Sequence, residues 1–285
     1  MPDTHIAIIF DFDDTLVPDS TSQLLEEYGM DPDSFWEDEF SPLLTEGYDP
    51  ANAYITLILE KIGPDRPFGE LTIDELQEFG SELDGQEFPG LPGFFEDIED
   101  MVSDYRDTMV DFYCISGGFR NVIIGTELSE YFRGIYASEL AHGPEDHITR
   151  IKKSVNFTEK TRYLFEINKG FEQEQTRRDP YLVNEQMDQE ERRVPFENMI
   201  YVGDGLTDIP CFSLLSNMGG SRFGVFDPVD QSSKQRALQL IGSSKGRVQS
   251  INPPEYNEDD ALGSLIRTKV EEICVENQFD EEQAL

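Results

Sequence analysis

Basic residues are scarce in this sequence. Its 285 residues include 22 Lys and Arg against 59 Asp and Glu, which gives a formal net charge of −37. Binding to nucleic-acid phosphates needs clustered Lys and Arg, so nucleic acid is disfavoured as a partner. Salt screens the mutual repulsion of so many carboxylates. The composition therefore predicts a protein adapted to a high-salt cytoplasm, with an ordinary acidic protein as the alternative.

Long apolar runs and cysteine pairs are missing as well. The run Ile6–Phe10 is far too short to span a bilayer, and no signal-peptide pattern is seen at the N-terminus. We therefore expect a cytoplasmic protein that does not act at a membrane. Cys114, Cys211 and Cys274 lie far apart without a C-x-x-C pair, so neither a disulfide framework nor a zinc site is indicated. Cys114 and Cys211 lie in or near apolar runs and are interpreted as buried thiols.

Short apolar runs alternate with helical patterns along the chain. Strands are predicted at Ile6–Phe10, Met109–Ile115, Gly134–Ser138, Met199–Val202 and Gly224–Phe226, the last of them before an acidic tail that is either an ordered helix or a frayed end. Helices are predicted at Ser22–Tyr28, Ala51–Ile62, Leu71–Leu83 and Thr158–Asn168, the last with Leu164, Phe165 and Ile167 on its apolar side, and residues 172–194 are predicted to be a solvated connection. This alternation predicts an α/β fold with a parallel sheet.

No strand pattern occurs from about residue 20 to residue 87. Helical periodicity alternates there with Asp-Pro pairs, and Thr72 followed by Glu75 forms a capping box. We therefore predict a helical insertion. Its aromatic cluster, Phe35, Trp36 and Phe40, either packs the insertion's own core, which is the favoured interpretation, or lines a pocket.

Three of the predicted strands end in conspicuous polar groups. Asp11 and Asp13 follow the first strand, Ser116 and Gly117 follow MVDFYCI, and Asp204 and Asp208 follow MIYV (residues 199–202). Ligands bind at the carboxyl ends of strands in parallel sheets, so we expect these groups to meet. Clustered carboxylates repel one another and suit a hard cation such as Mg²⁺. The sequence therefore predicts a metal site at this edge.

Two further features point to an anion at the same edge. The stretch SGG at residues 116–118 follows a strand and precedes a helical pattern, so its hydroxyl and backbone N–H groups are candidate anion ligands. Lys160, near a helix start, is a candidate point charge for a phosphate. Arg120, two residues past SGG, either touches substrate or pairs with a surface acid.

Taken in order, these motifs resemble those of the haloacid dehalogenase-like (HAD) hydrolase superfamily. Its first motif, D-x-D-x-T-L after an apolar strand, matches IAIIFDFDDTL, and its second, a strand followed by Ser or Thr, matches FYCISGG. The third, a lysine upstream of the fourth, matches Lys160 in EKTRYLFEINKG. The fourth, G-D-x-x-x-D, matches GDGLTD at Gly203–Asp208. The resemblance covers roughly 200 residues and implies a Rossmann-like core with an inserted helical cap.

The resemblance also implies a role for each matching residue. Asp11 would be the nucleophile that carries an aspartyl-phosphate, and Asp13 the general acid and base. Mg²⁺ would be bound by Asp11, by Asp13 through its backbone carbonyl, and by Asp204. The remaining roles follow in the same way: Ser116, Gly117 and Lys160 would bind the phosphoryl oxygens, Asp208 would support the metal or Lys160, and Thr15 would brace the loop.

The aspartate at position 13 favours phosphoryl transfer within this superfamily, because its dehalogenase members lack an acid there. The expected activity is hydrolysis of a small-molecule phosphate monoester. Residues 1–17 and 89–285 would form the catalytic core and residues 18–88 a cap like that of phosphoserine phosphatases. VPDSTS after the first motif lacks the glutamate by which those enzymes meet the substrate ammonium. The alternatives are a phosphotransferase or phosphomutase, and a non-catalytic phosphate-binding protein.

Overall fold

A seven-stranded sheet forms the centre of the molecule, in the strand order β4-β3-β2-β1-β5-β6-β7. The computed structural model describes residues 4–144, 146–241 and 246–284, with side chains as far as residue 279. The strands are β1 (Thr4–Phe10), β2 (Thr108–Phe119), β3 (Phe132–His142), β4 (Ile148–Lys153), β5 (Met199–Gly203), β6 (Ser221–Val225) and β7 (Ser250–Asn252). All neighbours are parallel except β3 and β4, which are antiparallel. The predicted α/β class with a parallel sheet is confirmed.

Strand β1 is central because both of its faces are apolar. Ile6, Ile8 and Phe10 point into one hydrophobic core, whereas Ala7 and Ile9 point into another. All five side chains are fully buried. A strand covered on both faces needs such a continuous apolar run, because successive side chains alternate between the faces.

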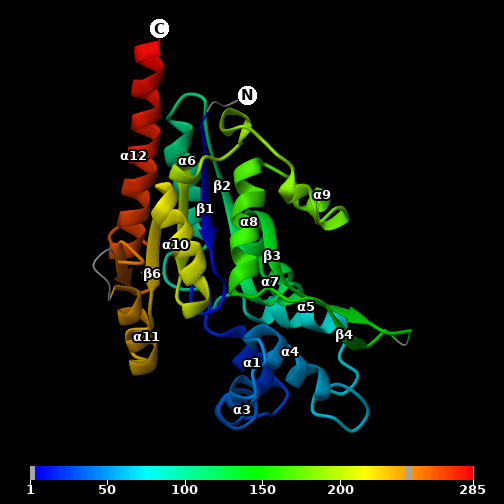
Figure 1. Ribbon diagram of the computed structural model, residues 1–285. Helices are drawn as coiled ribbons and strands as arrows, with labels where there is room; N and C mark the ends of the chain where they lie inside the picture. The colour runs from blue at the N-terminus through cyan, green and yellow to red at the C-terminus, as the bar shows by residue number, and fades with distance from the viewer. Residues whose placement is uncertain (1–3, 145, 242–245, 285) are drawn as a thin grey trace.

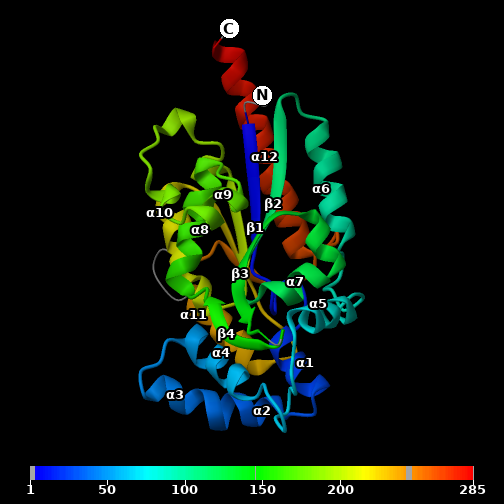
Figure 2. The ribbon, with the colours of Figure 1, turned by 90° about the vertical axis from the view of Figure 1, so that its right-hand side faces the viewer.

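Helices cover both faces of the sheet (Figures 1 and 2). One core packs against α8 (Phe157–Lys169), α10 (Ile209–Met218) and α11 (Gln231–Ile241), and the other against α6 (Gly93–Ser103), α7 (Arg120–Gly125) and α12 (Ala261–Ala284). A further short helix, α9 (Gln173–Arg178), follows α8. Short 3₁₀ turns occur at Glu127–Tyr131, Leu182–Asn184, Gln189–Glu191, Phe196–Asn198 and Leu206–Asp208. Among the described helices, none combines the length and the apolar character that a bilayer crossing requires.

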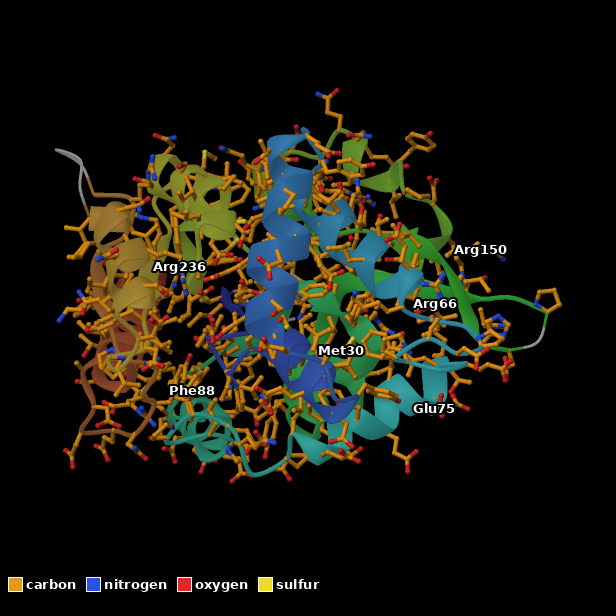
Figure 3. The ribbon with its side chains drawn as sticks, turned by 90° about the horizontal axis from the view of Figure 1, so that it is seen from below. Met30, Arg66, Glu75, Phe88, Arg150 and Arg236 are labelled. Carbon is orange, nitrogen blue, oxygen red and sulfur yellow. The ribbon has the colours of Figure 1, made fainter. Side chains whose placement is uncertain are left out.

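The segment between β1 and α6 consists of helices and turns. Its elements are α1 (Ser20–Glu27), α2 (Pro32–Ser34), a π-helical turn (Phe35–Phe40), α3 (Ser41–Thr45), α4 (Pro50–Glu60) and α5 (Ile73–Glu82). The helices α1 to α4 lie beyond one end of the sheet, and Figure 3 looks onto them from below. The helices predicted in this segment are confirmed, as is the capping box of Thr72 and Glu75. The boundaries 18–88 of a separate cap domain stay a prediction.

Helix α5 packs closely on α7 of the core. A Cβ at Gly80 would lie 2.1 Å from the carbonyl oxygen of Val122, so only glycine allows this approach. Next to α5, Ile148 of β4 donates its N–H to the carbonyl of Leu71 at 2.8 Å, and Thr72 forms an isolated bridge with His147. The β3–β4 hairpin and α7 thus hold the end of the insertion.

Several elements differ from the sequence-based expectation. The strand predicted at Gly224–Phe226 is the end of β6 and is not the last strand, because β7 adds to the sheet beyond it, and β4 also was not predicted. Both were missed because β7 has only three residues and β4, with the sequence ITRIKK, is a polar edge strand. Residues 172–194 contain α9 as well as connecting turns. Of the two alternatives for the acidic tail, the ordered helix is correct for residues 261–284.

Helix α8 corrects one side-chain assignment. Lys160, Tyr163, Leu164 and Ile167 form its buried stripe, at the i, i+3, i+4 and i+7 spacing of a helix face. Phe165, predicted on the apolar side, is 37% exposed because it lies one residue, or about 100°, away from that stripe. The stripe therefore places a lysine, not a phenylalanine, against the sheet.

Candidate active site

Three strand ends converge as predicted. The Asp11 N–H donates to the carbonyl of Val202 at 2.9 Å, so β1 and β5 stay paired until the first aspartate. Beyond them lies a cavity of about 220 Å³, which is lined by Asp11, Asp13, Asp14, Asp19, Thr21, Trp36, Tyr54, Ser116, Gly117, Gly118, Asp204 and Thr207. The motif residues thus share this cavity with side chains of the helical insertion.

Lys160 is fully buried next to this cavity. Its ammonium lies 2.6 Å from Oδ2 of Asp11 and 2.7 Å from Oδ1 of Asp208. Burial alone would lower the pKa of Lys160, but the two carboxylates outweigh burial and raise the pKa above its ordinary value. Lys160 therefore remains an ammonium and joins two motifs that are 197 residues apart in the chain.

Asp208 is an anchor for that lysine. Its Oδ1 also accepts a hydrogen bond from the hydroxyl of Tyr201 at 2.7 Å, and its Oδ2 accepts one from the Gly205 N–H at 3.2 Å. Asp208 is fully buried, so its carboxylate oxygens depend on these protein donors and not on water for their hydrogen bonds. Of the two predicted roles for Asp208, the contact with Lys160 is the one observed.

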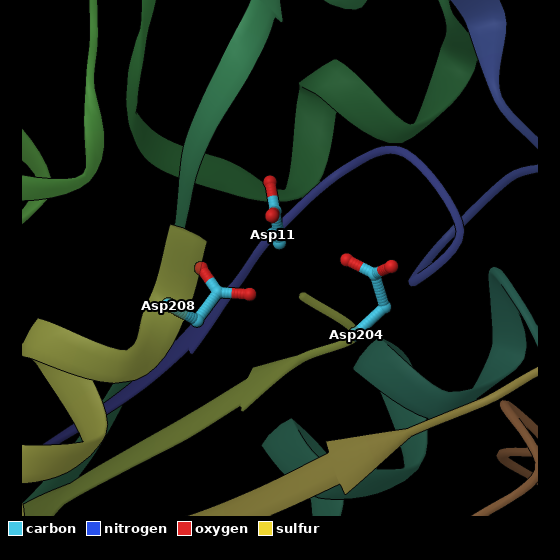
Figure 4. A group of neighbouring side chains, drawn as sticks. All are labelled: Asp11, Asp204 and Asp208. Carbon is cyan, nitrogen blue, oxygen red and sulfur yellow. The ribbon is translucent and has the colours of Figure 1, made fainter. Parts of the chain in front are cut away.

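A group of three carboxylates has the spacing of a metal site. Oxygens of Asp11, Asp204 and Asp208 all lie within 4.8 Å of one another (Figure 4). Burial, together with the neighbouring charges of Asp11 and Asp208, raises the pKa of Asp204 well above its ordinary value. Lys160 contacts both Asp11 and Asp208, so Asp204 is the carboxylate of this group without that cation beside it. Oxygen donors in such a group suit a hard divalent cation.

Asp13 has surroundings that differ from those of Asp11. Its Oδ1 accepts hydrogen bonds from the N–H of Ser20 at 2.8 Å and from the Ser20 hydroxyl at 2.5 Å. Its Oδ2 lies against Gly118, where a Cβ would come within 2.6 Å. Burial, with a further contribution from the charge of Asp19, raises the pKa of Asp13 to about 8. This carboxyl therefore holds its proton more firmly than an ordinary aspartate does.

The SGG stretch, predicted to follow its strand, instead lies inside β2, where the register with β3 is irregular between Ile115 and Phe119. It is held from two sides. The Ser116 hydroxyl is buried and accepts the Gly118 N–H at 2.9 Å. The carbonyl of Gly117 accepts hydrogen bonds from Tyr54 of α4 at 2.6 Å and from Ser138 of β3 at 2.8 Å. Neither Tyr54 nor Ser138 was predicted as a site residue. Both lie in ordinary apolar patterns, so the sequence holds no signal that singles them out.

Thr15 also lies at this end of the sheet. Its backbone carbonyl accepts a hydrogen bond from the hydroxyl of Tyr256 at 2.7 Å. Its own hydroxyl is buried and makes no hydrogen bond within the described part of the chain. The contact that holds this loop therefore runs through the Thr15 backbone and comes from the C-terminal segment. The predicted bracing role of the Thr15 side chain stays a prediction.

The insertion and the loop before it bring further polar groups into the cavity that were not predicted as site residues. Asp14 has a left-handed backbone, with φ of 55°, and burial, followed by the charge of Asp19, raises its pKa to about 6. Asp19 caps α1 by accepting the N–H groups of Thr21 and Ser22. Trp36 lines the cavity and donates its indole N–H to the Ser22 hydroxyl at 2.9 Å.

The predicted aromatic cluster therefore has two roles. Phe35 is buried and packs edge-on against Trp36, which in turn packs against Phe40. The favoured packing interpretation holds for these contacts, while Trp36 in addition faces the cavity. The predicted buried thiols Cys114 and Cys211 are confirmed as buried and free.

Comparisons with known proteins agree with this architecture. No protein-family model matches the chain. An uncharacterized protein of Borreliella burgdorferi is 29% identical over 241 residues, which cover 75% of this chain and 79% of that protein. A HAD family hydrolase of Salmonella enterica serovar Typhi superposes with a TM-score of 0.53 at 17% identity, covering 83% of this chain and 66% of that one.

Two phosphoserine phosphatase structures superpose in the same way. One, described as a phospho-aspartyl intermediate analogue, has a TM-score of 0.52 at 14% identity and covers 93% of this chain and 99% of that one. A probable phosphoserine phosphatase of Vibrio cholerae has a TM-score of 0.53 at 11% identity and covers 97% of this chain and 67% of that one. The chain therefore has the HAD hydrolase fold in its phosphoserine phosphatase-like form, as the four motifs predicted.

Proposed function

We propose that this HAD-fold protein is a Mg²⁺-dependent phosphatase that hydrolyses a small-molecule phosphate monoester through an aspartyl-phosphate on Asp11. The observation that carries the proposal is the buried Lys160 ammonium between Asp11 and Asp208, next to a cavity that Asp11 shares with a second carboxyl, Asp13, whose pKa is raised. Two carboxyl groups with different protonation states are what a nucleophile and a general acid require.

Asp11 is suited to the nucleophilic role. Burial raises its pKa to about 6, and the neighbouring Lys160 ammonium limits this rise, so the carboxylate is ionised at neutral pH. The Phe12 N–H donates to its Oδ1 at 2.8 Å and Lys160 to its Oδ2. These two hydrogen bonds fix the orientation of the carboxylate toward the cavity.

Asp13 would move the proton in both half-reactions. In the first, an Asp11 oxygen bonds to phosphorus as the bond to the leaving oxygen breaks, and the Asp13 proton passes to that oxygen. In the second, a water oxygen attacks the phosphorus of the aspartyl-phosphate and gives its proton to Asp13. The bond to Asp11 then breaks and inorganic phosphate leaves, so both residues return to their starting states.

The remaining site residues would bind charge. Asp11 and Asp204 would hold Mg²⁺, together with the backbone carbonyl of Asp13. When bound, the ion neutralises phosphoryl oxygens and keeps the carboxylates from repelling the substrate. Lys160 and Ser116 would also bind the phosphoryl oxygens. The Gly117 N–H would add a donor, while the hydrogen bonds to the Gly117 carbonyl hold the turn in place.

The cavity supports a small substrate of low negative charge. Its volume is about 220 Å³, and the lining includes five aspartates but no lysine or arginine. A second anionic group next to the phosphoester would face these carboxylates at short range, which is unfavourable where water is displaced. A neutral or cationic alcohol portion is therefore favoured.

Phosphate release from p-nitrophenyl phosphate tests the proposal. The assay uses Mg²⁺ at low and at molar KCl, with EDTA and with Asp11→Asn, which removes the nucleophilic carboxylate at nearly unchanged volume. We expect release that depends on Mg²⁺ and falls at least about 1000-fold in the variant, as expected for loss of a nucleophile. Asp107→Asn, at an exposed turn outside the cavity lining, is the matched control and should leave turnover unchanged. Turnover of Asp11→Asn close to that of the wild type would refute the mechanism.

A further inference from the structure

A second polar cavity is lined by none of the residues that line the active-site cavity. Its volume is about 420 Å³, and its walls come from α5, α7, β3, β4 and α9. The charged side chains that line it are Arg120, Glu139, Arg150, Lys152 and Arg177. Figure 3 shows Arg150 on β4, at one side of the molecule.

The charge of this cavity is opposite to that of the protein. Four of the 22 basic residues in the chain line it together with a single carboxylate, which gives a local formal charge of +3 in a molecule of −37. Like charges gathered at a few ångströms repel one another unless a counter-charge is present. Such a cluster in so acidic a chain calls for a ligand or partner of negative charge.

Glu139 does not compensate the whole cluster. Its carboxylate binds Arg177 through two hydrogen bonds of 2.8 and 2.9 Å and also lies 2.9 Å from the ammonium of Lys152. These two cations outweigh the effect of burial and lower the pKa of Glu139. Glu174 reaches Arg177 at 3.9 Å from the rim. Glu139 therefore forms ion pairs with Arg177 and Lys152, and Glu174 forms one with Arg177.

Arg120 and Arg150 are the two basic residues of the cavity lining that form no ion pair in the described part of the chain. Within the described ranges of the chain, neither has a carboxylate within 4.0 Å. Arg120 is partly buried, yet its only hydrogen bond in those ranges is from Nε to the carbonyl of Ile135, at 3.4 Å. Burial, followed by the charge of Arg177, lowers its pKa. Two guanidinium groups thus face a cavity without the bidentate acceptor that arginine prefers.

We propose that this cavity binds a small, multiply charged anion through phosphate or carboxylate groups held by Arg120 and Arg150. Its volume suits a ligand of metabolite size, and the two arginines offer planar donor pairs that fit such oxygens. Without Mg²⁺, the active-site cavity, lined by five aspartates and no basic side chain, disfavours the same ligand. The two cavities therefore select ligands of opposite character.

The second cavity is lined by residues that lie close in sequence to the SGG stretch of β2 and to Ser138 of β3. Arg120 lies two residues past Gly118, and Glu139 directly follows Ser138, whose hydroxyl donates to the carbonyl of Gly117. An anion bound between Arg120 and β4 thus contacts segments that hold the SGG turn. The site is distinct from the proposed substrate site and does not depend on the proposed reaction.

Isothermal titration calorimetry with pyrophosphate tests this site. The full chain is first freed of Mg²⁺ on a chelating resin, so that no Mg²⁺ bridges the ligand to the aspartates. It is then titrated without a soluble chelator, at the lowest KCl concentration that keeps the circular dichroism spectrum unchanged. We expect binding that weakens as KCl rises and falls about 10-fold in Arg120→Gln and in Arg150→Gln, since each removes one charged donor pair. Citrate, as a polycarboxylate, should compete with pyrophosphate for the same site.

Control variants distinguish this site from the active-site cavity and from a general effect of surface charge. Arg106→Gln, an exposed arginine without an ion pair in the described residues, should bind as the wild type does. Asp11→Asn should also retain binding, and a loss there would place the anion in the active site and overturn the proposal. Wild-type affinity in the Arg120→Gln, Arg150→Gln double variant would overturn it as well. Arg150 is exposed, so its variant keeps the test valid if Arg120→Gln does not fold.

Discussion

The hydroxyl of Tyr54, in the helical insertion, donates a hydrogen bond of 2.6 Å to the carbonyl of Gly117, in the SGG stretch of β2. Ser138 donates to the same carbonyl at 2.8 Å. This oxygen is therefore the point at which α4, β2 and β3 meet, and the position of the insertion is coupled directly to the turn that would bind phosphate.

Removing both donors should cost more than the sum of the single losses. Tyr54→Phe alone leaves the Gly117 carbonyl with one partner, so we expect it to lower the free energy of unfolding by about 1 kcal/mol. Ser138→Ala also removes the acceptor of the buried Val155 N–H, at 3.0 Å, so we expect it to cost about 1–3 kcal/mol. The double variant leaves a buried carbonyl unpaired, which adds about 1–3 kcal/mol. Urea unfolding of the four proteins measures this coupling. Strict additivity would show that water replaces the lost donors.

Lys160→Met should destabilise the fold strongly. The substitution keeps an unbranched side chain only one heavy atom shorter but leaves the carboxylates of Asp11 and Asp208 buried without their cation. Loss of one partner from a buried ion pair costs about 3–5 kcal/mol in the free energy of unfolding. Lys152→Met, which removes a half-exposed lysine from the surface, is the control for the change of residue type. Equal stability of the two variants would contradict the buried ion pair.

Gly80→Ala should separate α5 from α7. The new Cβ would lie 2.1 Å from the Val122 carbonyl oxygen, so the helices must move apart, at a cost of about 1–3 kcal/mol. Gly93→Ala, in the first turn of α6, meets no atom within 4 Å and serves as the matched control. Thermal unfolding compares the two. A control that unfolds at the lower temperature would be inconsistent with the close helix contact.

Stabilisation by Mg²⁺ should increase with pH. Burial raises the pKa of Asp11 to about 6 and that of Asp204 well above its ordinary value. Because these folded-state pKa values lie above the unfolded ones, ionisation destabilises the metal-free fold as pH rises through them. A cation binds the ionised form, so the Mg²⁺-induced rise in Tm should grow between about pH 5 and about pH 8. Asp204→Asn should abolish most of this rise, and a pH-independent rise would refute the assignment.

The fold should loosen in dilute buffer. With a net charge of −37, self-repulsion is screened only when the ionic strength is high. Circular dichroism against KCl concentration should therefore show helical signal gained as salt is added. Titration with sucrose at constant ionic strength is the control for effects other than screening. A spectrum that does not change with KCl would identify an ordinary acidic protein.

The central strands and the motif residues were predictable because local chemistry determines them. The run Ile6–Phe10 is apolar at every position, which a strand buried on both faces requires. Strand β7, by contrast, has three residues and is stabilised by its pairing with β6. Its own sequence is too short to predict it. The same is true of β4, whose residues alternate weakly and gain their partner only from β3.

The site shows the same division. Aspartates that follow neighbouring strands are brought together, and their charges repel one another unless a cation is bound. Asp11 and Asp204 could therefore be found from the sequence. A signal for Lys160 was also present, because this lysine occupies the apolar stripe of α8 at the spacing of Tyr163 and Leu164. Tyr54 could not be found in this way. A tyrosine on the apolar side of a helix looks like a core residue until the opposing carbonyl is placed.

The attachment of α5 has a practical consequence for making chimeras. The Ser81 hydroxyl donates to the carbonyl of Gly125, and the Asp84 carboxylate accepts the Glu127 N–H. With the Leu71–Ile148 contact, these bonds tie residues 71–84 to the core. The segment to exchange with a relative is therefore residues 20–62, which is shorter than the whole insertion, provided that Ser20 and Tyr54 are kept for their bonds to Asp13 and Gly117. A library of chimeras with those junctions would vary the cavity residues that come from the insertion, while those at the ends of the core strands stay the same.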